Sequence, residues 1–389
     1  MEKEVNENVV SEVSEKKKMA WWKKTLIGIG SSITGIFVLL LTFILILNVG
    51  KWGIYHNYYS IRELVCTNHG LNEGYVSQGT AITNDEKYVL TSGYMSDKSH
   101  SRVYITNTKT DESKYIGFER NGKKCTYHFG GVAISGDNVY IASNNRIFVV
   151  SFSAMLDAEN GAIFDLGEGY EVNNEASYVF TDDRYVYVGE FHDGKQYITE
   201  NEVTYEDTTH YAICSVYDIN DLSNLIKVYS LRNKVQGFAV APSGGILLST
   251  SFGLNSSELF FYRESSVIDT KTTYDGAPLY FLGEHDMVVQ GPAMMEDLDY
   301  VNGKFYTNFE SSCNKYIFGK FFINSNKIVA LDVEKILPKQ TKALWNLMGN
   351  FWGHLNSLWN LMGSKRAKFS PFYNGFEMHL YIKSFFWNE

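Results

Sequence analysis

The residues Gln78-Gly79-Thr80-Ala81-Ile82-Thr83 open a phrase that decides the fold of this chain, because the chain repeats it. Each copy starts with polar or small residues, continues through an apolar-rich stretch and a short turn, and ends in a tyrosine-rich or aliphatic strand. The copies begin at Gln78, Gly130, Glu175, Gln236 and Glu296, about 45 to 60 residues apart. One sheet of short strands cannot bury both of its faces alone, so this repeat predicts a radial β-propeller.

Four strands are predicted in the first repeat, at residues 78–83, 88–94, 102–107 and 114–118. The later repeats follow the same plan, but the fifth lacks an obvious outer strand before Pro338. We expect the segment Tyr59–Cys66, which precedes the first repeat, to supply that strand and close the ring. The predicted fold class is therefore all-β with five blades. Residues 267–289 contain two further strand-like runs, which leave a six-bladed ring as the alternative.

The composition suits a large packed sheet protein with an acidic surface. Of the 389 residues, 44% are apolar and 15% aromatic, and aromatic rings pack well on pleated strands. The net charge of −9 argues against a nucleic-acid partner, which would need a basic face. The four cysteines, at positions 66, 125, 214 and 313, have no metal-site spacing, and both disulfide pairing and buried free thiols remain open.

The N-terminal region has the pattern of an uncleaved membrane anchor. No charged residue occurs from Thr25 to Gly50, and residues 25–49 are long enough to cross a hydrocarbon core of about 30 Å as a helix. Five lysines between 16 and 24 precede this run, so residues 1–24 are expected to form a cytoplasmic tail, with the domain at 50–337 outside the cell. A cleaved signal peptide is the alternative, but no clear cleavage site closes the run.

The C-terminal region, residues 338–389, differs from the repeats in composition. The sequence Leu-Trp-Asn-Leu-Met-Gly occurs at 344–349 and again at 358–363, and the apolar side chains between them fall on one helical stripe. Such an amphipathic helix is able to lie in the lipid headgroup region. A helix that caps the propeller and an unstructured tail are the alternatives.

Polar residues at the repeat starts are the candidate site. In a propeller the innermost strands begin on one face, at a mouth of the central channel. The residues expected to converge there, with their neighbours, are Gln78, His128, Glu175, Gln236, Glu296 and Asp297. Carboxylate and amide oxygens suit Ca²⁺ or Mg²⁺, for which Glu175 and Glu296 are the expected ligands. Paired carboxylates also suit acid and base work, and hydrogen bonding between blades is the structural alternative.

Two long loops are expected to overhang the same mouth. They are His192–His210 in the third repeat and Glu310–Asn324 in the fifth. Long loops on one rim usually shape ligand specificity. The part of the site that recognises a ligand is therefore expected on this rim.

The phrases Gln78-Gly79-x-Ala81-Ile82, His128-x-Gly130-Gly131 and Met295-Glu296-Asp297 resemble those of uncharacterised, membrane-anchored or secreted propellers of Gram-positive bacteria. More remotely they are similar to gluconolactonase-like and streptogramin-lyase-like propellers. The resemblance implies a cation near the axial mouth, held by acidic and amide side chains at positions comparable to Glu175, Glu296, Gln78 and Gln236. The chain departs from the pattern, because no catalytic Asp or His pair is recognisable and six blades are not all visible.

Three functions fit these features. The first is a single-pass membrane protein whose extracellular propeller binds a small molecule or a cell-surface protein at its channel mouth. The alternative is a metal-dependent hydrolase or lyase of the lactonase-like type, and a purely structural scaffold is the third. The sequence contains no nucleophile elbow, phosphate loop or HExxH helix that would favour another enzyme class.

Overall fold

The computed structural model describes residues 32–43, 45–46 and 49–337. The chain divides into two units: residues up to Ser60 together with Val289–Gly291, and the remainder, which forms the propeller. The first unit is helical at 32–43, 45–46, 49–54 and in α2 (His56–Ile61), with apolar side chains such as Ile33 and Leu39 largely exposed. Within these described residues, none of the helices has both the length and the apolar character needed to span a bilayer. The predicted regions 1–24 and 338–389 lie outside the described residues.

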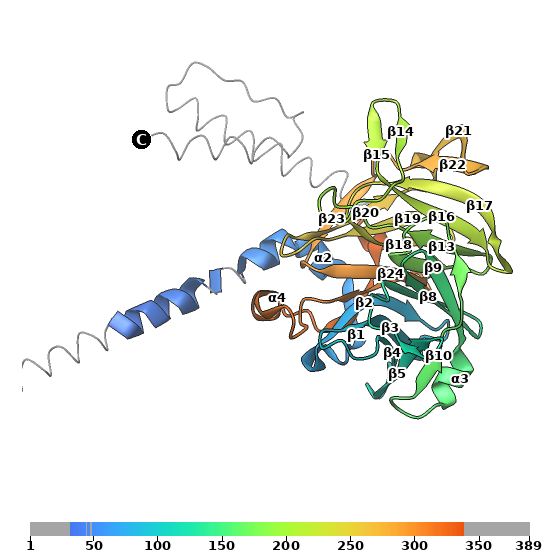
Figure 1. Ribbon diagram of the computed structural model, residues 1–389. Coiled ribbons are helices and arrows are strands. Elements are labelled where there is room, and N and C mark those ends of the chain that lie inside the picture. The colour runs from blue at the N-terminus through green and yellow to red at the C-terminus, as the bar shows by residue number, and fades with distance from the viewer. Residues whose placement is uncertain (1–31, 44, 47–48, 338–389) are drawn as a thin grey trace, which may run out of the picture. The chain divides into compact units, whose positions relative to one another are not determined.

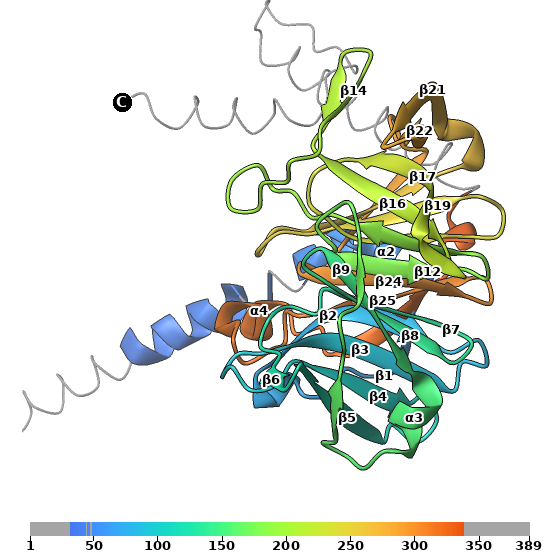
Figure 2. The ribbon, with the colours of Figure 1, turned by 45° about the vertical axis from the view of Figure 1, so that its right-hand side comes forward.

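Five blades surround one axis (Figures 1 and 2). Four blades run outward in chain order. The first blade comprises β2 (Tyr75–Ile82), β3 (Tyr88–Met95), β4 (Arg102–Asn107) and β5 (Ser113–Arg120), and the second comprises β7 (Gly131–Ser135), β8 (Asn138–Ser143), β9 (Arg146–Ser151) and β11 (Tyr170–Glu171). The third blade comprises β12 (Tyr178–Thr181), β13 (Tyr185–Gly189), β16 (Ala212–Asp218) and β17 (Asp221–Leu231), and the fourth comprises β18 (Val235–Val240), β19 (Ile246–Thr250), β20 (Ser257–Tyr262) and β23 (Met287–Gly291). The prediction of an all-β propeller with five blades is confirmed.

The fifth blade joins the two ends of the propeller. It contains β24 (Met295–Val301), β25 (Lys304–Phe309) and β26 (Lys327–Leu331), and its outer strand is β1 (Arg62–Thr67). Strand β1 is antiparallel to β26, with Leu64 opposite Val329. The expected closure by the segment before the first repeat is therefore confirmed, although the strand begins three residues later than predicted.

The six-bladed alternative is wrong, because residues 267–289 are divided between two existing blades. The hairpin of β21 (Ile268–Tyr274) and β22 (Ala277–Phe281) extends the third blade, where β22 runs parallel to β17. Strand β23 completes the fourth blade. The apolar alternation of both runs indicated strands correctly, but periodicity alone does not say which sheet a strand joins.

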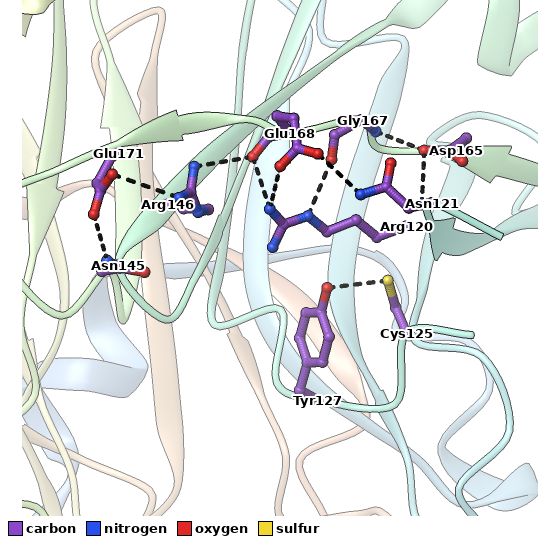
Figure 3. A network of polar contacts seen from close by, with 10 residues as sticks. All are labelled: Arg120, Asn121, Cys125, Tyr127, Asn145, Arg146, Asp165, Gly167, Glu168 and Glu171. Atoms are coloured by element: carbon purple, nitrogen blue, oxygen red, sulfur yellow. Dashed lines mark hydrogen bonds and ion pairs between the residues drawn. The ribbon is translucent and has the colours of Figure 1, made fainter. Parts of the chain in front are cut away.

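A parallel strand also links the first two blades. Strand β10 (Ile163–Asp165) follows β9 and the short helix α3 (Phe152–Asp157), yet it pairs with β5 of the first blade. Figure 3 shows the polar contacts beside this crossing, where Arg120 Nη2 lies 2.7 Å from Glu168 Oε2. Arg146 donates to the Glu168 carbonyl at 3.1 Å. Blades one and two are thus linked by a parallel strand at their outer edges. Strand β10 pairs with β5 there, just as β22 pairs with β17 between blades three and four.

Glycines allow the inner strands to meet at the axis. A Cβ atom on Gly79 would lie 2.5 Å from the Val132 nitrogen, and one on Gly131 would lie 2.4 Å from the Val179 nitrogen. On Gly237 it would lie 2.5 Å from the Leu298 nitrogen. Neighbouring inner strands therefore approach each other backbone to backbone, which only glycine permits.

Hydrophobic layers fill the space between the blades away from the axis. Between blades one and two, Leu90 and Phe118 pack with Phe129 and Phe148, all of them essentially inaccessible. The four cysteines are buried and free, so disulfides do not link them. The blades are held together by apolar packing and backbone contact, which removes the need for covalent links.

We expect Gly131→Ala and Gly237→Ala each to lower the free energy of unfolding by about 1–3 kcal/mol, because a methyl group there overlaps the backbone of the next blade. Chemical denaturation of the full chain in detergent micelles measures the loss. The matched control is Gly283→Ala, whose Cβ would meet its nearest neighbour at an ordinary 3.5 Å. Equal stability of all three variants would contradict the backbone contact at the axis.

Candidate functional site at the mouth of the propeller

The inner strands of all five blades begin on one face, which we call the mouth face. The loops between the second and third strands of each blade open on it as well. The loop of the third blade carries the hairpin of β14 (Val203–Tyr205) and β15 (Thr208–His210), and that of the fifth carries α4 (Ile317–Phe322). In Figure 2, α4 lies on the left of the propeller, and α3, from the opposite face, lies at the lower right. Both long loops thus leave from the rim at which they were expected.

β-Bulges in three inner strands contain four of the predicted site residues. The register shifts between Ser77 and Gly79 in β2 and between Val235 and Gly237 in β18, so Gln78 and Gln236 are the extra residues. In β24 the shift lies between Met295 and Leu298, which sets Glu296 and Asp297 together against Asn308. A bulge re-aims a side chain that regular pairing would direct elsewhere. The polar residue that opens three of the repeats is therefore a bulge residue.

Glu296 and Glu310 form a carboxyl pair next to Gln78. Glu310 directly follows β25, and its backbone nitrogen donates to the Met294 carbonyl at 3.1 Å, beside the start of β24. The Gln78 side-chain nitrogen donates to Glu310 Oε2 at 3.0 Å. Burial and the neighbouring Glu310 and Asp297 carboxyls hold the pKa of Glu296 well above its usual range. Burial also raises the pKa of Glu310 to about 7, although hydrogen bonding by Tyr316 and the charge of Lys315 act against this rise.

Aromatic and cationic groups surround this carboxyl pair. The Lys315 ammonium donates to the Tyr94 hydroxyl and lies 4.8 Å from the centre of that ring. The His128 ring stacks on the Tyr94 ring, with 4.1 Å between the two ring centres. Burial of the ring and the charges of Lys315 and Lys98 hold the pKa of His128 below its usual value. The imidazole is therefore neutral at pH 7, while the residue keeps an exposed edge.

Asp297 lies deeper and is tied to the backbone near the axis. It is fully buried, and its carboxyl accepts from the Leu298 nitrogen at 2.9 Å and from the Val132 nitrogen at 3.3 Å. These bonds connect the fifth blade with the second. Burial nevertheless raises the pKa of Asp297 well above its usual range. This carboxyl satisfies backbone donors, so its contacts are those of a structural residue.

Glu175 is separate from the carboxyl pair in its contacts. The inner strand of the third blade begins at Tyr178, so Glu175 precedes it and is exposed. Its backbone nitrogen donates at 3.3 Å to Glu190, a buried carboxyl whose pKa is raised by burial to about 7. In the part of the chain that the structure describes, no three His, Cys, Asp or Glu side chains are close enough to hold a metal ion.

Sequence reasoning missed Glu310 as the partner of Glu296. It placed Glu310 at the end of the second strand of the fifth repeat and at the start of the overhanging loop that contains Lys315 and Tyr316, but it did not pair Glu310 with Glu296. The available signal was the antiparallel pairing of β24 with β25, which brings the residue after the second strand next to the start of the first. Glu190, which follows β13 in the same way, was missed for the same reason.

A hollow of about 290 Å³ lies beside this site, on the fourth blade. Lys234, Ser251, Phe252, Asn255 and Glu258 are among its lining residues. Residues next to its lining are joined to β24, because Ser249 Oγ donates to the Glu296 carbonyl at 2.5 Å and the Met295 nitrogen donates to Ser257 Oγ at 3.1 Å. The hollow and the carboxyl pair therefore open on the same face.

The raised pKa of Glu310 predicts that this buried carboxyl contributes less to the stability of the folded protein as the pH rises. Unfolded glutamate has a pKa near 4.3, so between about pH 4 and pH 7 the folded state holds protons that the unfolded state has lost. We expect Glu310→Gln to remove part of this loss, roughly 1–3 kcal/mol at pH 8 relative to pH 5. Denaturation midpoints at both pH values measure the difference. The exposed Glu284→Gln control is expected to keep the wild-type slope, and an unchanged slope in Glu310→Gln would contradict the buried carboxyl pair.

Comparison with known proteins gives no family for the chain. No protein-family model matches it, and no curated protein sequence matches it significantly. Similar solved structures include an aldose sugar dehydrogenase with bound PQQ from Streptomyces coelicolor, at 16% identity and TM-score 0.37, covering 64% of this chain and 77% of that one. A gluconolactonase from Xanthomonas campestris has 9% identity and TM-score 0.33, with coverage of 69% and 94%. Hydrazine synthase from Kuenenia stuttgartiensis has 10% identity and TM-score 0.33, and this chain covers 55% of its length against 60% of its own. Likenesses at this level carry no inference about activity.

Proposed function

We propose that the protein is a single-pass membrane protein whose extracellular propeller binds a ligand with a cationic group at the mouth face. The charge-free run from Thr25 to Gly50 and the lysines before it support the anchor and its orientation. The exposed apolar side chains of helical residues 32–43 support it as well, because such side chains favour lipid over water. The propeller would then present its mouth face outside the cell.

The observation that carries the ligand proposal is the carboxyl pair Glu296 and Glu310, with Gln78 hydrogen-bonded to it. Two enclosed carboxyls favour sharing a proton over carrying two charges. A ligand cation, either an amine or a divalent ion, would replace that proton. Affinity should therefore increase as the pH rises through 7, because the proton competes with the ligand.

A second candidate is a hydrolase or lyase of the lactonase-like type that uses Ca²⁺ or Mg²⁺. The observation that favours it is a pair of neighbouring buried carboxyls, Glu296 and Glu310, because burial raises the pKa of both. Such a pair can hold one proton between its members, so that one group acts as an acid and the other as a base. The metal ligands in this version would be Glu175 and Glu296, as the sequence predicts.

We expect CaCl₂ or spermidine to raise the unfolding midpoint of the EDTA-treated full chain in detergent, and more at pH 8 than at pH 6. Glu296→Gln and Glu310→Gln should each abolish the increase, because they remove a charge that the cation needs. Glu175→Gln is the matched variant: it should respond like the wild type to both probes unless Glu175 is a metal ligand. A midpoint that neither probe moves in any variant would contradict a cation site.

The anchor is tested separately in cells that express the full chain. We expect the protein to stay in the membrane pellet after carbonate extraction, because a spanning helix is not removed by high pH. Added protease should degrade the propeller in intact cells and leave residues 1–24 protected. Release into the carbonate supernatant, or protection of the propeller, would contradict the proposed topology.

A further inference from the structure

We propose that the short helix α4 of the fifth blade lies in the headgroup region of the bilayer, where Ile317, Phe318 and Phe321 contact lipid. We call these three side chains the α4 face. The inference rests on the proposed membrane anchor and goes beyond it, because it assigns a second membrane contact to the propeller itself. It uses neither carboxyl of the cation site at Glu296 and Glu310.

The α4 face is a cluster of large apolar side chains that are exposed together. Ile317 is 72% exposed, Phe318 65% and Phe321 66%. An α-helix turns by about 100° per residue, so positions 317, 318 and 321 fall within about one third of its circumference. Single exposed apolar residues are ordinary, whereas a cluster of them marks a contact with another apolar surface.

The other side of α4 is seated on the propeller. A Cβ atom on Gly319 would lie 2.7 Å from the Ser311 carbonyl oxygen, so the helix lies against the backbone that follows β25. Lys320 Nζ donates to Asn72 Oδ1 at 2.5 Å and to Asn314 Oδ1 at 2.6 Å, which ties the helix to the turn before β2. These contacts hold the helix in one orientation and direct the α4 face outward.

The charge of the loop favours an anionic surface. Residues 311–326 contain two lysines, Lys315 and Lys320, and no Asp or Glu, although the whole chain has a net charge of −9. The other long loop of the mouth face, His192–His210, contains five acidic residues and one lysine, so its exposed Ile198 belongs to an acidic loop. Apolar and aromatic side chains beside lysines are typical of helices that lie on bilayers with anionic lipid.

The fifth blade is also the blade to which the anchor is connected. Its outer strand β1 begins at Arg62, and only eleven residues, 51–61, separate it from the end of the charge-free run. As a helix, eleven residues span about 16 Å, which is close to the depth of about 17 Å of the five-residue strand β26. This connection is long enough to reach the mouth face along the blade and short enough to keep the blade near the bilayer. Lipid is therefore the apolar partner within reach of α4.

The full chain in nanodiscs of phosphatidylcholine and phosphatidylglycerol in equal parts tests this contact. Phe321→Cys carries the environment-sensitive fluorophore NBD, and the wild type is the labelling control because its four cysteines are buried. We expect the emission to shift to the blue and nitroxide-labelled lipid to quench it at least twofold. The matched control is Tyr170→Cys, because Tyr170 is 51% exposed but lies on β11 of the second blade, and its label should not be quenched.

A second substitution tests the charge of the surface. Phe318→Asp, added to the labelled chain, should lower the quenching at least twofold, because anionic head groups repel a carboxylate. Tyr170→Asp should leave the quenching unchanged.

The outcomes separate this inference from the anchor. A label on Phe321→Cys that stays in water would overturn the α4 contact. So would a blue shift without quenching by lipid, which would show that a second copy or residues 338–389 cover the α4 face. A chain that does not co-elute with the nanodiscs contradicts the anchor, and this inference with it, whereas a chain that co-elutes without quenching contradicts the α4 contact alone.

Discussion

Backbone contact between neighbouring inner strands is the constraint on which the rest of this propeller depends. Gly79, Gly131 and Gly237 lie where a Cβ atom would meet the backbone of the next blade. With so little space at the axis, side chains from the inner strands cannot all point inward. The polar residues just before Gly79 and Gly237 are displaced by bulges instead, and this displacement brings Gln78 and Gln236 to the mouth face. Tight packing at the axis and polar groups at the mouth are therefore one structural feature.

The same constraint explains why carboxyl groups are enclosed here. Asp297 and Asp299 alternate along β24, and Asp299 accepts from the Ile82 nitrogen at 2.7 Å, across the boundary with the first blade. Each carboxyl satisfies a backbone donor that a neighbouring blade would leave unpaired. The enclosure that makes these bonds strong also disfavours the charged forms, and burial raises the pKa of Asp299 to about 7. The axis is thus stable while its carboxyls are protonated or fully hydrogen-bonded.

The repeat predicted the number of blades and the closing strand because both follow from local patterns. Alternation identifies strands, and the start of each repeat identifies the end of the inner strand that meets the mouth. Pairing between carboxyls depends on register, and a bulge changes register without changing the hydrophobic pattern. For this reason Gln78 and Glu296 were correctly placed on inner strands, while Glu310 was not identified as their neighbour. Glu175 begins a repeat whose inner strand starts only at Tyr178, so its repeat position did not give its structural position.

The position of the carboxyl pair follows from how the ring closes. Where blades one and two, two and three, and four and five meet, a glycine lets the backbones touch. Between blades five and one, where the ends of the propeller join, polar side chains make the contact: Asn308 donates to Ser77 at 2.8 Å and Gln78 donates to Glu310 at 3.0 Å. Polar pairs enforce register more strictly than apolar packing, because a shift of one residue leaves them unsatisfied in a buried place. A closing blade built from two distant parts of the chain needs such register most. Two of the groups that align the ends of the propeller, Gln78 and Glu310, therefore also belong to the carboxyl site.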